Sequence, residues 1–415
     1  MEEWKEYKLG ELSIGKGSYG IGASAVSYSP SLHTYLRITD INDDGTLNKN
    51  GLMSLDDENA DEYILQPNDI VFARTGNSTG RSYFYDGSDG ILVYAGFLIK
   101  FSLDSKKVNP RILKYYTHSK PYFDWVRSFD TGGTRGNINA KTYGDMPIVL
   151  PPRKLQDQIV SILKSFDDKI EVNRRINENL EQQAQALFKS WFVDFEPFKN
   201  GEFVESELGM IPKGWRVCRA DEVFDINIGK TPPRKEPEWF TKNTSDNIWV
   251  SIADMGSCGM FVSESSEYLT NEAINRFNIL MVDEGSVLLS FKLTVGRVAI
   301  AGTRLTTNEA IARFQLPQSY YREFLYLYLK QYKYGNLGST SSIATAVNSK
   351  TIKGMKLITP PEDVISWFSK HTKPLFDKIK VLSQESRRLA ELRDTLLPKL
   401  MSGELNVFDK PNDQS

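Results

Sequence analysis

The chain has 415 residues, of which 40% are hydrophobic and 25% are charged, and its formal net charge is −2. This composition is typical of a globular protein with two or more domains, and it shows no global basic excess of the kind that marks many nucleic-acid-binding proteins. A basic face can still be balanced by acidic residues elsewhere. The two cysteines, Cys218 and Cys258, stand far apart, which favours a reducing compartment. The start lacks the pattern of a signal peptide, and the apolar runs, such as residues 91–101, are too short to span a bilayer. We therefore expect a cytoplasmic protein without a membrane partner.

The first motif, residues 13–20, reads Ser-Ile-Gly-Lys-Gly-Ser-Tyr-Gly and matches the Gly-x-Gly-x-x-Gly spacing of dinucleotide-binding loops. That fingerprint requires a helix directly after the glycines, and the residues that follow Gly20 are poor helix formers. A second stretch, Gly229-Lys230-Thr231, looks like the end of a phosphate-binding loop, but Phe224 stands where that loop needs its first glycine. We expect no nucleotide at either stretch.

Short runs rich in β-forming residues follow each of these motifs, at residues 35–38, 69–74 and 286–291. Two aromatic, helix-like stretches come next, at residues 113–125 and 320–334, with lysines and arginines between the aromatic residues. Such stretches occur in nucleic-acid-binding surfaces, although aromatic residues at this spacing belong more often to a core. A loop rich in Gly, Ser and Thr follows each stretch.

The chain contains a tandem duplication, because several short segments recur in the same order along its two halves. Each copy is a mixed domain followed by a long helical segment, and we place the boundaries of the four parts at residues 1–150, 151–200, 201–358 and 359–415. The recurring segments are Asn139-Ala-Lys-Thr142 with Asn348-Ser-Lys-Thr351, Asp168-Lys-Ile170 with Asp377-Lys-Ile379, and Gly80-Arg81 with Gly296-Arg297.

The helical segments carry apolar residues at a heptad spacing with charged residues between them, which predicts two coiled-coil helices. The first, residues 155–191, would be roughly 50 Å long at about 1.5 Å per residue. Packing the two seams against each other in antiparallel fashion is the simplest way to bury both; an ordinary amphipathic helix in a bundle is the alternative. Asn173 and Asn177 lie in the seam and can fix its register, and Pro374 is expected to kink or break the second helix. The predicted seam residues are Ile159, Leu163, Phe166, Ile170, Leu180, Leu187, Leu375, Ile379, Leu382, Leu389 and Leu396.

We find no catalytic constellation in the sequence. None of the three Pro-Pro pairs has the Asn or Asp before it and the aromatic residue after it that mark an adenine methyltransferase. The three histidines, His33, His118 and His371, are scattered, so a metal site or a His-based triad has no basis. The sequence therefore predicts a chain that is not an enzyme and holds no metal.

Two similar modules on a rigid spacer suit a protein that reads two half-sites on one DNA duplex. Lys and Arg would position the phosphates, while Arg, Asn, Ser or Thr side chains would read base edges. Asp40 and Asp254 could accept from cytosine, but we favour a role in capping turns. The candidate DNA contacts, chosen from polar loops at duplicated positions, are Lys16, Arg74, Arg81, Arg135, Asn137, Lys230, Arg297, Thr340 and Ser341.

Several longer motifs carry a family resemblance. Residues 156–192, which include Phe-Asp-Asp-Lys-Ile at 166–170 and Ala-Leu-Phe-Lys-Ser-Trp-Phe at 186–192, closely resemble the central region of the specificity (S) subunit of type I restriction-modification systems. Residues 208–215, Leu-Gly-Met-Ile-Pro-Lys-Gly-Trp, are similar to that family's entry into its second target-recognition domain, and residues 392–405 resemble its C-terminal end. The resemblance covers nearly the whole chain and is most specific in the helical regions.

The resemblance implies an α+β fold, in which two mixed α/β target-recognition domains are joined by two long antiparallel coiled-coil helices. Such a chain would be a non-catalytic subunit that binds double-stranded DNA and two methyltransferase subunits, which methylate adenine N6 with S-adenosylmethionine. Restriction subunits that use ATP and Mg²⁺ would complete the complex, and no cofactor would reside in this chain. A twin-module scaffold for protein interactions and a specificity subunit that works without a restriction motor are the alternatives.

Overall fold

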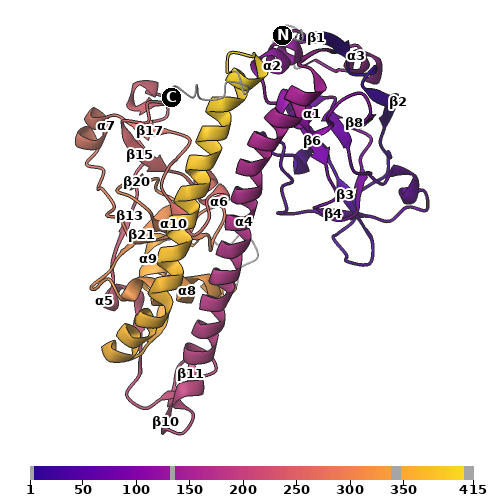
Figure 1. Ribbon diagram of the computed structural model, residues 1–415. Coiled ribbons are helices and arrows are strands. Elements are labelled where there is room, and N and C mark those ends of the chain that lie inside the picture. Colours follow the sequence, from indigo (N-terminus) through magenta and orange to yellow (C-terminus); the bar gives the residue numbers. More distant parts are fainter. Residues whose placement is uncertain (1–3, 131–135, 338–346, 406–415) are drawn as a thin grey trace, which may run out of the picture. The chain divides into compact units, whose positions relative to one another are not determined.

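The computed structural model describes residues 4–130, 136–337 and 347–405. The chain forms two compact units, residues 1–169 with 389–415 (unit 1) and residues 170–388 (unit 2). Each unit contains a mixed α/β domain and parts of two 40-residue helices, α4 (Arg153–Phe192) and α10 (Glu362–Met401), drawn in magenta and yellow in Figure 1. The predicted α+β class with two mixed domains and two long helices is confirmed. No helix in the described part of the chain has both the length and the apolar content that a bilayer crossing requires.

The domain of unit 1 is built on a four-stranded antiparallel sheet in the order β2-β8-β5-β6, beside a three-stranded sheet in the order β4-β3-β7. Every residue of β5 is buried, and Phe72 on that strand stacks on Tyr143 with ring centroids 4.7 Å apart. Tyr115 and Tyr122 are also buried, whereas Phe123 is 39% exposed, so most of the first aromatic stretch is core. The elements are β1 (Lys5–Lys8), β2 (Ser13–Tyr19), β3 (His33–Leu36), β4 (Met53–Leu55), β5 (Asp69–Ala73), β6 (Ser82–Tyr85), β7 (Leu92–Tyr94), β8 (Leu98–Leu103), α1 (Arg111–Tyr116), α2 (Lys120–Arg127), α3 (Ala140–Gly144) and β9 (Pro147–Leu150).

The domain of unit 2 has the corresponding five-stranded sheet in the order β13-β21-β18-β19-β16 and a four-stranded sheet in the order β14-β17-β15-β20. Its aromatic helix α8 buries Phe324 and Tyr326, so the second aromatic stretch is also core. The elements are β10 (Phe203–Ser206), β11 (Gly209–Pro212), β12 (Arg216–Arg219), α5 (Ala220–Val223), β13 (Asp225–Ile228), β14 (Phe240–Thr241), β15 (Asn247–Val250), α6 (Ile252–Ser257), β16 (Phe261–Val262), β17 (Tyr268–Leu269), α7 (Asn271–Arg276), β18 (Val287–Ser290), β19 (Val298–Ala301), β20 (Thr306–Thr307), β21 (Ile311–Gln315), α8 (Tyr321–Gln331), α9 (Ser349–Lys353) and β22 (Lys356–Thr359).

The recurring Asn-x-Lys-Thr segments have the same structural task in both copies. The Asn139 side chain accepts a hydrogen bond from the Thr142 backbone N–H (2.9 Å) and thereby caps α3, and Asn348 accepts one from the Thr351 N–H (3.0 Å) and caps α9. The strand that follows each short helix pairs with a strand near the start of its domain, β9 with β1 and β22 with β12. The repeat therefore closes each domain directly before its long helix begins.

The first Gly-Lys motif lies within a β-strand and the second directly follows one, and neither forms a phosphate-binding turn before a helix. Residues 13–19 form β2 itself, and a Cβ at Gly17 would collide with the Phe101 ring. Gly229 follows β13, and a Cβ there would collide with the carbonyl oxygens of Thr307 and Asn308. These glycines allow close packing of neighbouring segments, and no helix follows them as a dinucleotide fingerprint would require.

Within unit 2, α4 and α10 run antiparallel, as predicted. The Asn173 Nδ2 donates to Glu385 Oε2 (2.8 Å) and to Ser386 Oγ (3.3 Å), and the Asn177 Nδ2 donates to Ser383 Oγ (3.2 Å). Farther along α4, the Trp191 ring lies 4.4 Å from the Trp367 ring of α10, measured between centroids. Residue numbers thus rise along one helix as they fall along the other.

The predicted seam is buried most completely at four positions, Ile159, Leu163, Ile379 and Leu382. Phe376 is fully buried, whereas its predicted neighbour Leu375 is half-buried, because the helices also pack against the domain cores with a broader apolar stripe than a strict heptad seam. The other predicted positions are half-buried: Phe166, Ile170, Leu180, Leu187, Leu389 and Leu396.

Of the kink or break predicted at Pro374, the break does not occur, because α10 is a single helix from Glu362 to Met401. Proline removes one backbone N–H, so the carbonyl oxygen of Lys370 loses its usual donor. Both Pro374 and Lys370 are exposed, so water can satisfy that carbonyl. The helix therefore tolerates the residue on its solvent side.

Replacement of Asn173 by Ala should destabilise the protein. The substitution removes the donor to Glu385 and leaves a void at a completely buried position, so we expect the free energy of unfolding to fall by about 1–3 kcal/mol. Urea denaturation followed by tryptophan fluorescence measures this change. Gln182→Ala, on an exposed position of the same helix, should change the value by less than about 0.5 kcal/mol. Equal stability of the two variants would contradict the assignment.

Candidate nucleic-acid interface

An edge strand of unit 1 presents Lys16 to solvent. The pairing of β2 with β8 shifts register between Ile14 and Ser18, where Gly15 has a φ of +76°. A bulge of this kind bends the strand and redirects its side chains. Lys16 is exposed and has no ion pair or hydrogen bond to another side chain within the described ranges. Its charge is therefore available to a partner.

Arg74, which directly follows β5, lies where three segments of unit 1 converge. Its guanidinium carbon lies 5.1 Å from the centroid of the Tyr19 ring, a cation–π contact that orients the group. Its backbone N–H donates to Phe97 (3.1 Å), and its carbonyl accepts from the Ile138 N–H (3.0 Å). The Nε atom is buried and has no hydrogen-bond partner among the described residues.

We call the group of Lys16, Tyr19, Arg74, Phe97 and Asn137 the first surface. Tyr19 and Phe97 are 42% and 57% exposed, and Asn137 is exposed next to the residue that bonds to Arg74. The hydrogen bond from the Ile138 N–H to the Arg74 carbonyl thus brings Arg74 and Asn137 together, beside the end of β2 and the start of β8, both labelled in Figure 1. Exposed aromatic rings beside free Arg, Lys and Asn groups can stack on bases, contact phosphates and read base edges.

Arg81 pairs through its backbone carbonyl with the Ala73 N–H (2.8 Å), directly before Arg74, and its side chain is itself paired. Its Nε donates to Asp43 Oδ1 (2.7 Å), and its Nη1 donates to the Ile41 carbonyl (3.2 Å). These bonds hold the chain after β3 against the turn before β6. As a DNA contact Arg81 stays a prediction, and its described partners give it a structural role.

The two aspartates considered for cytosine contacts cap turns. Asp40 is 3% exposed and accepts from the Arg37 backbone N–H (2.9 Å) and from the Arg37 Nη2 (2.7 Å). Asp254 accepts from the Ser251 backbone N–H (2.8 Å) and from the Ser266 N–H (2.9 Å). The favoured interpretation of both residues as caps is confirmed.

In unit 2, the duplicated cations bind backbone carbonyls. The Lys230 Nζ donates to the carbonyls of Phe277 (3.1 Å) and Asn278 (3.0 Å), which directly follow α7. The Arg297 Nη1 donates to the Ile252 carbonyl (2.6 Å). Lys230 therefore differs from Lys16, its counterpart in the repeat, and the role of either in DNA binding stays a prediction. Three further candidates, Arg135, Thr340 and Ser341, lie outside the described residues.

Sequence reasoning missed an aromatic-stacked arginine in unit 2. The Arg234 guanidinium lies 4.2 Å from the Phe240 ring and 4.7 Å from the Trp249 ring, and its Nη1 is 2.9 Å from Glu267. The available signal was a Pro-Pro-Arg segment followed by aromatic residues. It was too weak to use, because the aromatic partners lie on separate strands.

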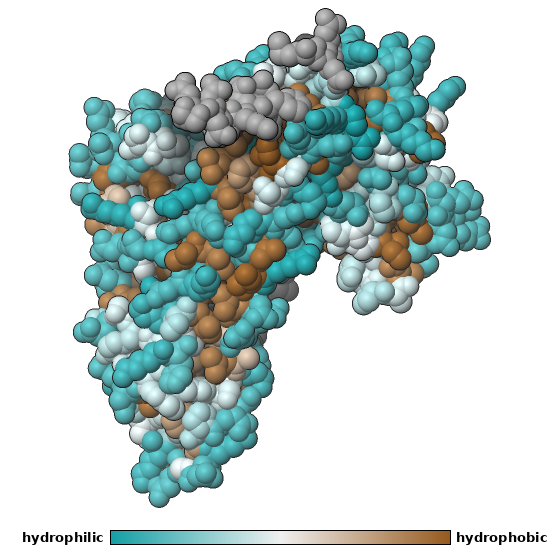
Figure 2. Space-filling model, in the orientation of Figure 1, coloured by the Kyte–Doolittle hydropathy of each residue, from teal (hydrophilic) through white to brown (hydrophobic). Residues whose placement is uncertain are grey.

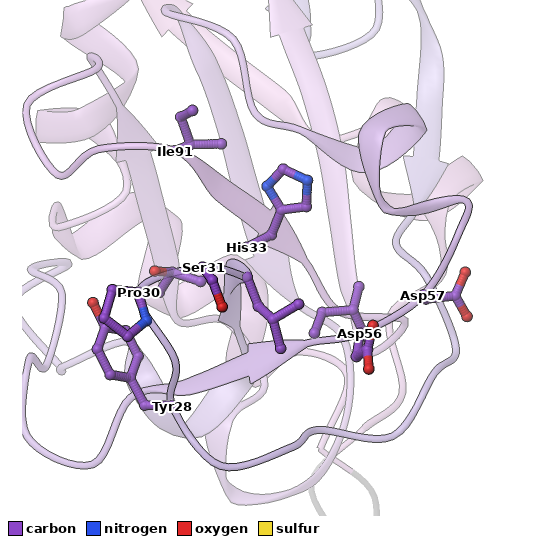
Figure 3. A pocket seen from close by; sticks show the side chains of 10 residues that line it. Tyr28, Pro30, Ser31, His33, Asp56, Asp57 and Ile91 are labelled. Carbon is purple, nitrogen blue, oxygen red and sulfur yellow. The ribbon is translucent and has the colours of Figure 1, made fainter.

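A hollow of about 520 Å³ lies beside β3 and β4 of unit 1. Figure 3 shows His33 within this hollow, whereas Asp57 points away from the other labelled side chains. The His33 Nε2 lies 2.9 Å from Asp61 Oδ1. Among the residues that the structure describes, no three His, Cys, Asp or Glu side chains gather as metal ligands would.

Lys114, a base in the first aromatic stretch, is bound within unit 1. Asp167 of α4 accepts from Lys114 Nζ (2.7 Å), Arg393 Nη1 (2.9 Å) and the Tyr115 hydroxyl (3.0 Å). Burial raises the pKa of Asp167, but the attraction of Lys114 and Arg393 outweighs burial, and the net pKa lies below its usual value. The cluster ties α1 to both long helices within this unit.

The Asp167 cluster predicts a specific dependence of stability on pH. Because the folded-state pKa of Asp167 is lowered, its contribution is present above the pKa of the unfolded chain and disappears as the pH falls below about 4. Asp167→Asn should therefore lower the free energy of unfolding by about 2 kcal/mol at pH 7 and by much less at pH 3.

Urea denaturation of wild type and variant between pH 7 and pH 3 measures this difference. The neighbouring Asp168 has a side chain that is 58% exposed, so Asp168→Asn serves as the control and should cost less than about 0.5 kcal/mol throughout. A difference for Asp167→Asn that does not change with pH would contradict the ion-pair assignment.

Comparison with known proteins shows which family the sequence resembles. The family profile described as the type I restriction modification DNA specificity domain matches residues 1–182 and 212–367. The HindI specificity subunit of Haemophilus influenzae is 26% identical over 98% of this chain and 100% of its own length. The MjaIX specificity subunit of Methanocaldococcus jannaschii is 31% identical over 71% of this chain and 69% of its own length.

One solved structure has a similar fold. The crystal structure of a type I restriction-modification system S subunit from M. genitalium is 14% identical, covers 96% of both chains and has a TM-score of 0.51. At this identity, the likeness concerns the fold alone.

Proposed function

The chain belongs to the family of type I restriction-modification specificity subunits, and from this premise we propose that each of its two mixed domains reads one half of a split DNA target. The observation that carries the proposal is the divergence between the two copies. Their capped helices and closing strand pairs are alike, whereas their exposed polar groups differ, as in the free Lys16 and the carbonyl-bound Lys230. Different readers suit two different half-sites.

In unit 1 the first surface supplies the groups for reading. A guanidinium oriented by an aromatic ring, as in Arg74, suits the O6 and N7 acceptors of guanine, and the Asn137 amide suits adenine. Lys16 would contact phosphate, which positions the duplex without reading its sequence. In unit 2 we propose the same division between phosphate and base contacts. Lys230, Arg234 and Arg297 would either contact the DNA or support the residues that do.

We further propose that the long helices bind two methyltransferase subunits and fix the gap between the half-sites. Within unit 2 four apolar side chains of these helices are 38–56% exposed, and Figure 2 shows brown patches over α4 and α10. Exposed apolar groups on paired helices favour docking of a protein partner. The four residues are Val172, Ile176, Trp367 and Val381.

On this proposal the chain itself catalyses no reaction. The methyltransferase subunits would hold S-adenosylmethionine and methylate adenine N6. Restriction subunits that use ATP and Mg²⁺ would join the same complex.

Adenine methylation mapped across the genome, in cells with and without this gene, tests the proposal. We expect one motif of two short half-sites with a fixed gap to lose methylation when the gene is deleted. Methylation that is unchanged by the deletion, together with no DNA binding by the chain and its methyltransferase, would refute the proposal.

Two substitutions on the first surface should have different effects on DNA binding. Arg74→Ala should relax discrimination at one position of one half-site by about 1–3 kcal/mol. Lys16→Ala should instead weaken binding to all sequences alike and reduce the slope of log K against log salt by about 1. Binding of the complex to a library of target variants at several salt concentrations distinguishes the two.

Lys106 serves as the matched control. It is exposed and lies just beyond the C-terminal end of β8, whereas Tyr19 pairs with Ile99 near the N-terminal end of that strand. Lys106→Ala should leave both specificity and salt slope unchanged. If all three variants behave alike, the first surface is not the DNA-binding face.

A further inference from the structure

The loop after β18 presents an apolar side chain to solvent in a strained conformation. Leu293 is 99% exposed and has a φ of +60°. The Thr294 N–H donates to the Lys292 carbonyl (2.6 Å), which closes a γ-turn with positive φ at its central residue. Full exposure of a leucine and left-handed backbone at a non-glycine residue are both unfavourable, and such outliers concentrate at functional sites.

The strained tip is held firmly at its base. The Ser290 Oγ donates to the Thr294 carbonyl (2.6 Å) and accepts from the Arg297 N–H (3.0 Å), and the Gly296 N–H donates to the Ser290 carbonyl (3.0 Å). The Arg297 side chain in turn anchors this region to the Ile252 carbonyl. The loop therefore presents Leu293 in a fixed position without any need for ordering on binding.

The loop at the corresponding place in unit 1 has no exposed leucine and is built differently. Gly76 is the third residue after β5, and Leu293 is the third residue after the corresponding strand β18. Both have positive φ, +69° at Gly76 and +60° at Leu293. The loop of unit 1 is one residue longer up to the paired Gly80 and contains a 3-10 turn at Gly76–Ser78, and its left-handed residue is a glycine, which the backbone favours there. Unit 2 has a fully exposed leucine instead.

The divergence of this loop favours DNA over a protein partner. Two identical methyltransferase subunits bound to the two copies would select the same surface in both. Two different half-sites would select different tips on the same loop. Lys292, exposed directly beside Leu293, adds a positive charge suited to a phosphate.

We propose that Leu293 is a specificity-determining residue that packs on the 5-methyl group of a thymine in the half-site read by unit 2. A leucine side chain has no hydrogen bond to offer, and the thymine methyl is the apolar group that base pairs present in the major groove. This inference rests on the proposed function and names the chemistry of one contact within it.

The test uses the chain in complex with its methyltransferase subunits and duplexes in which each thymine of that half-site is replaced in turn by uracil. Uracil lacks only the methyl group, so at one position we expect wild-type binding to weaken about fourfold. Leu293→Asn should bind the thymine duplex about tenfold more weakly and should no longer distinguish thymine from uracil. Asparagine has nearly the shape of leucine and tolerates positive φ, so the loop should keep its conformation.

Leu280→Asn is the matched control, because Leu280 is 57% exposed in the same unit and lies outside the loop. It should bind and discriminate like the wild type, and the melting temperature of Leu293→Asn should equal or exceed that of the wild type. Wild-type binding that is insensitive to uracil at every position, a half-site without thymine on either strand, or normal discrimination by Leu293→Asn would each overturn the inference. If the inference fails but the wild-type complex still binds one split motif specifically, the proposed function stands. If the wild-type complex shows no sequence preference, both the inference and the proposed function are refuted.

Discussion

The pairing of the two long helices depends on polar contacts within a largely apolar seam. Asn173 is completely buried, and its amide nitrogen is shared by Glu385 and Ser386 of the opposite helix. Apolar seams tolerate slippage by a turn, but a buried amide is satisfied in one register only. The Asn173 Oδ1 is buried without a partner in the described part of the chain, which is a cost in stability. The seam thus gives up some stability in exchange for a defined alignment of α4 with α10.

The basic residues of the chain fall into two groups, those bound by other groups of the protein and those available to a partner, and the near-neutral net charge does not distinguish them. Lys114, Arg81 and Lys230 are bound by carboxylates or carbonyls within their own units, so they hold elements of the fold together. Lys16 has no described partner, and Arg74 has an aromatic ring in place of a carboxylate. Only the second group can attract a polyanion without first breaking an internal bond, so the total charge carries little information about DNA binding.

The fold was largely predictable from the sequence because its signals are periodic or repeated. The heptads predicted both long helices, and the recurring Asn-x-Lys-Thr segments predicted equivalent domains because each encodes the same helix cap. Pro374 misled because its effect depends on which side of the helix it occupies, and the sequence alone did not settle that. The acceptors of Arg297 and Lys230 were not predictable for a different reason. They are backbone carbonyls of residues 252, 277 and 278, and a backbone carbonyl has no signature in the sequence.

The candidate site was harder to predict than the fold because the residues that read DNA are not repeated in the two copies. Duplication preserves whatever both copies need, such as the caps at Asn139 and Asn348, and a comparison of the copies finds those residues easily. A reader of two different half-sites must diverge at the residues that read. A choice of duplicated positions therefore finds residues that stabilise the fold, such as Arg81 and Arg297. The positions that can read different half-sites instead differ in side chain between the two copies. The loops after β5 and β18 show this divergence, since both have a residue of positive φ at the third position after the strand, but they differ in length by one residue and carry Gly76 and the exposed Leu293 there.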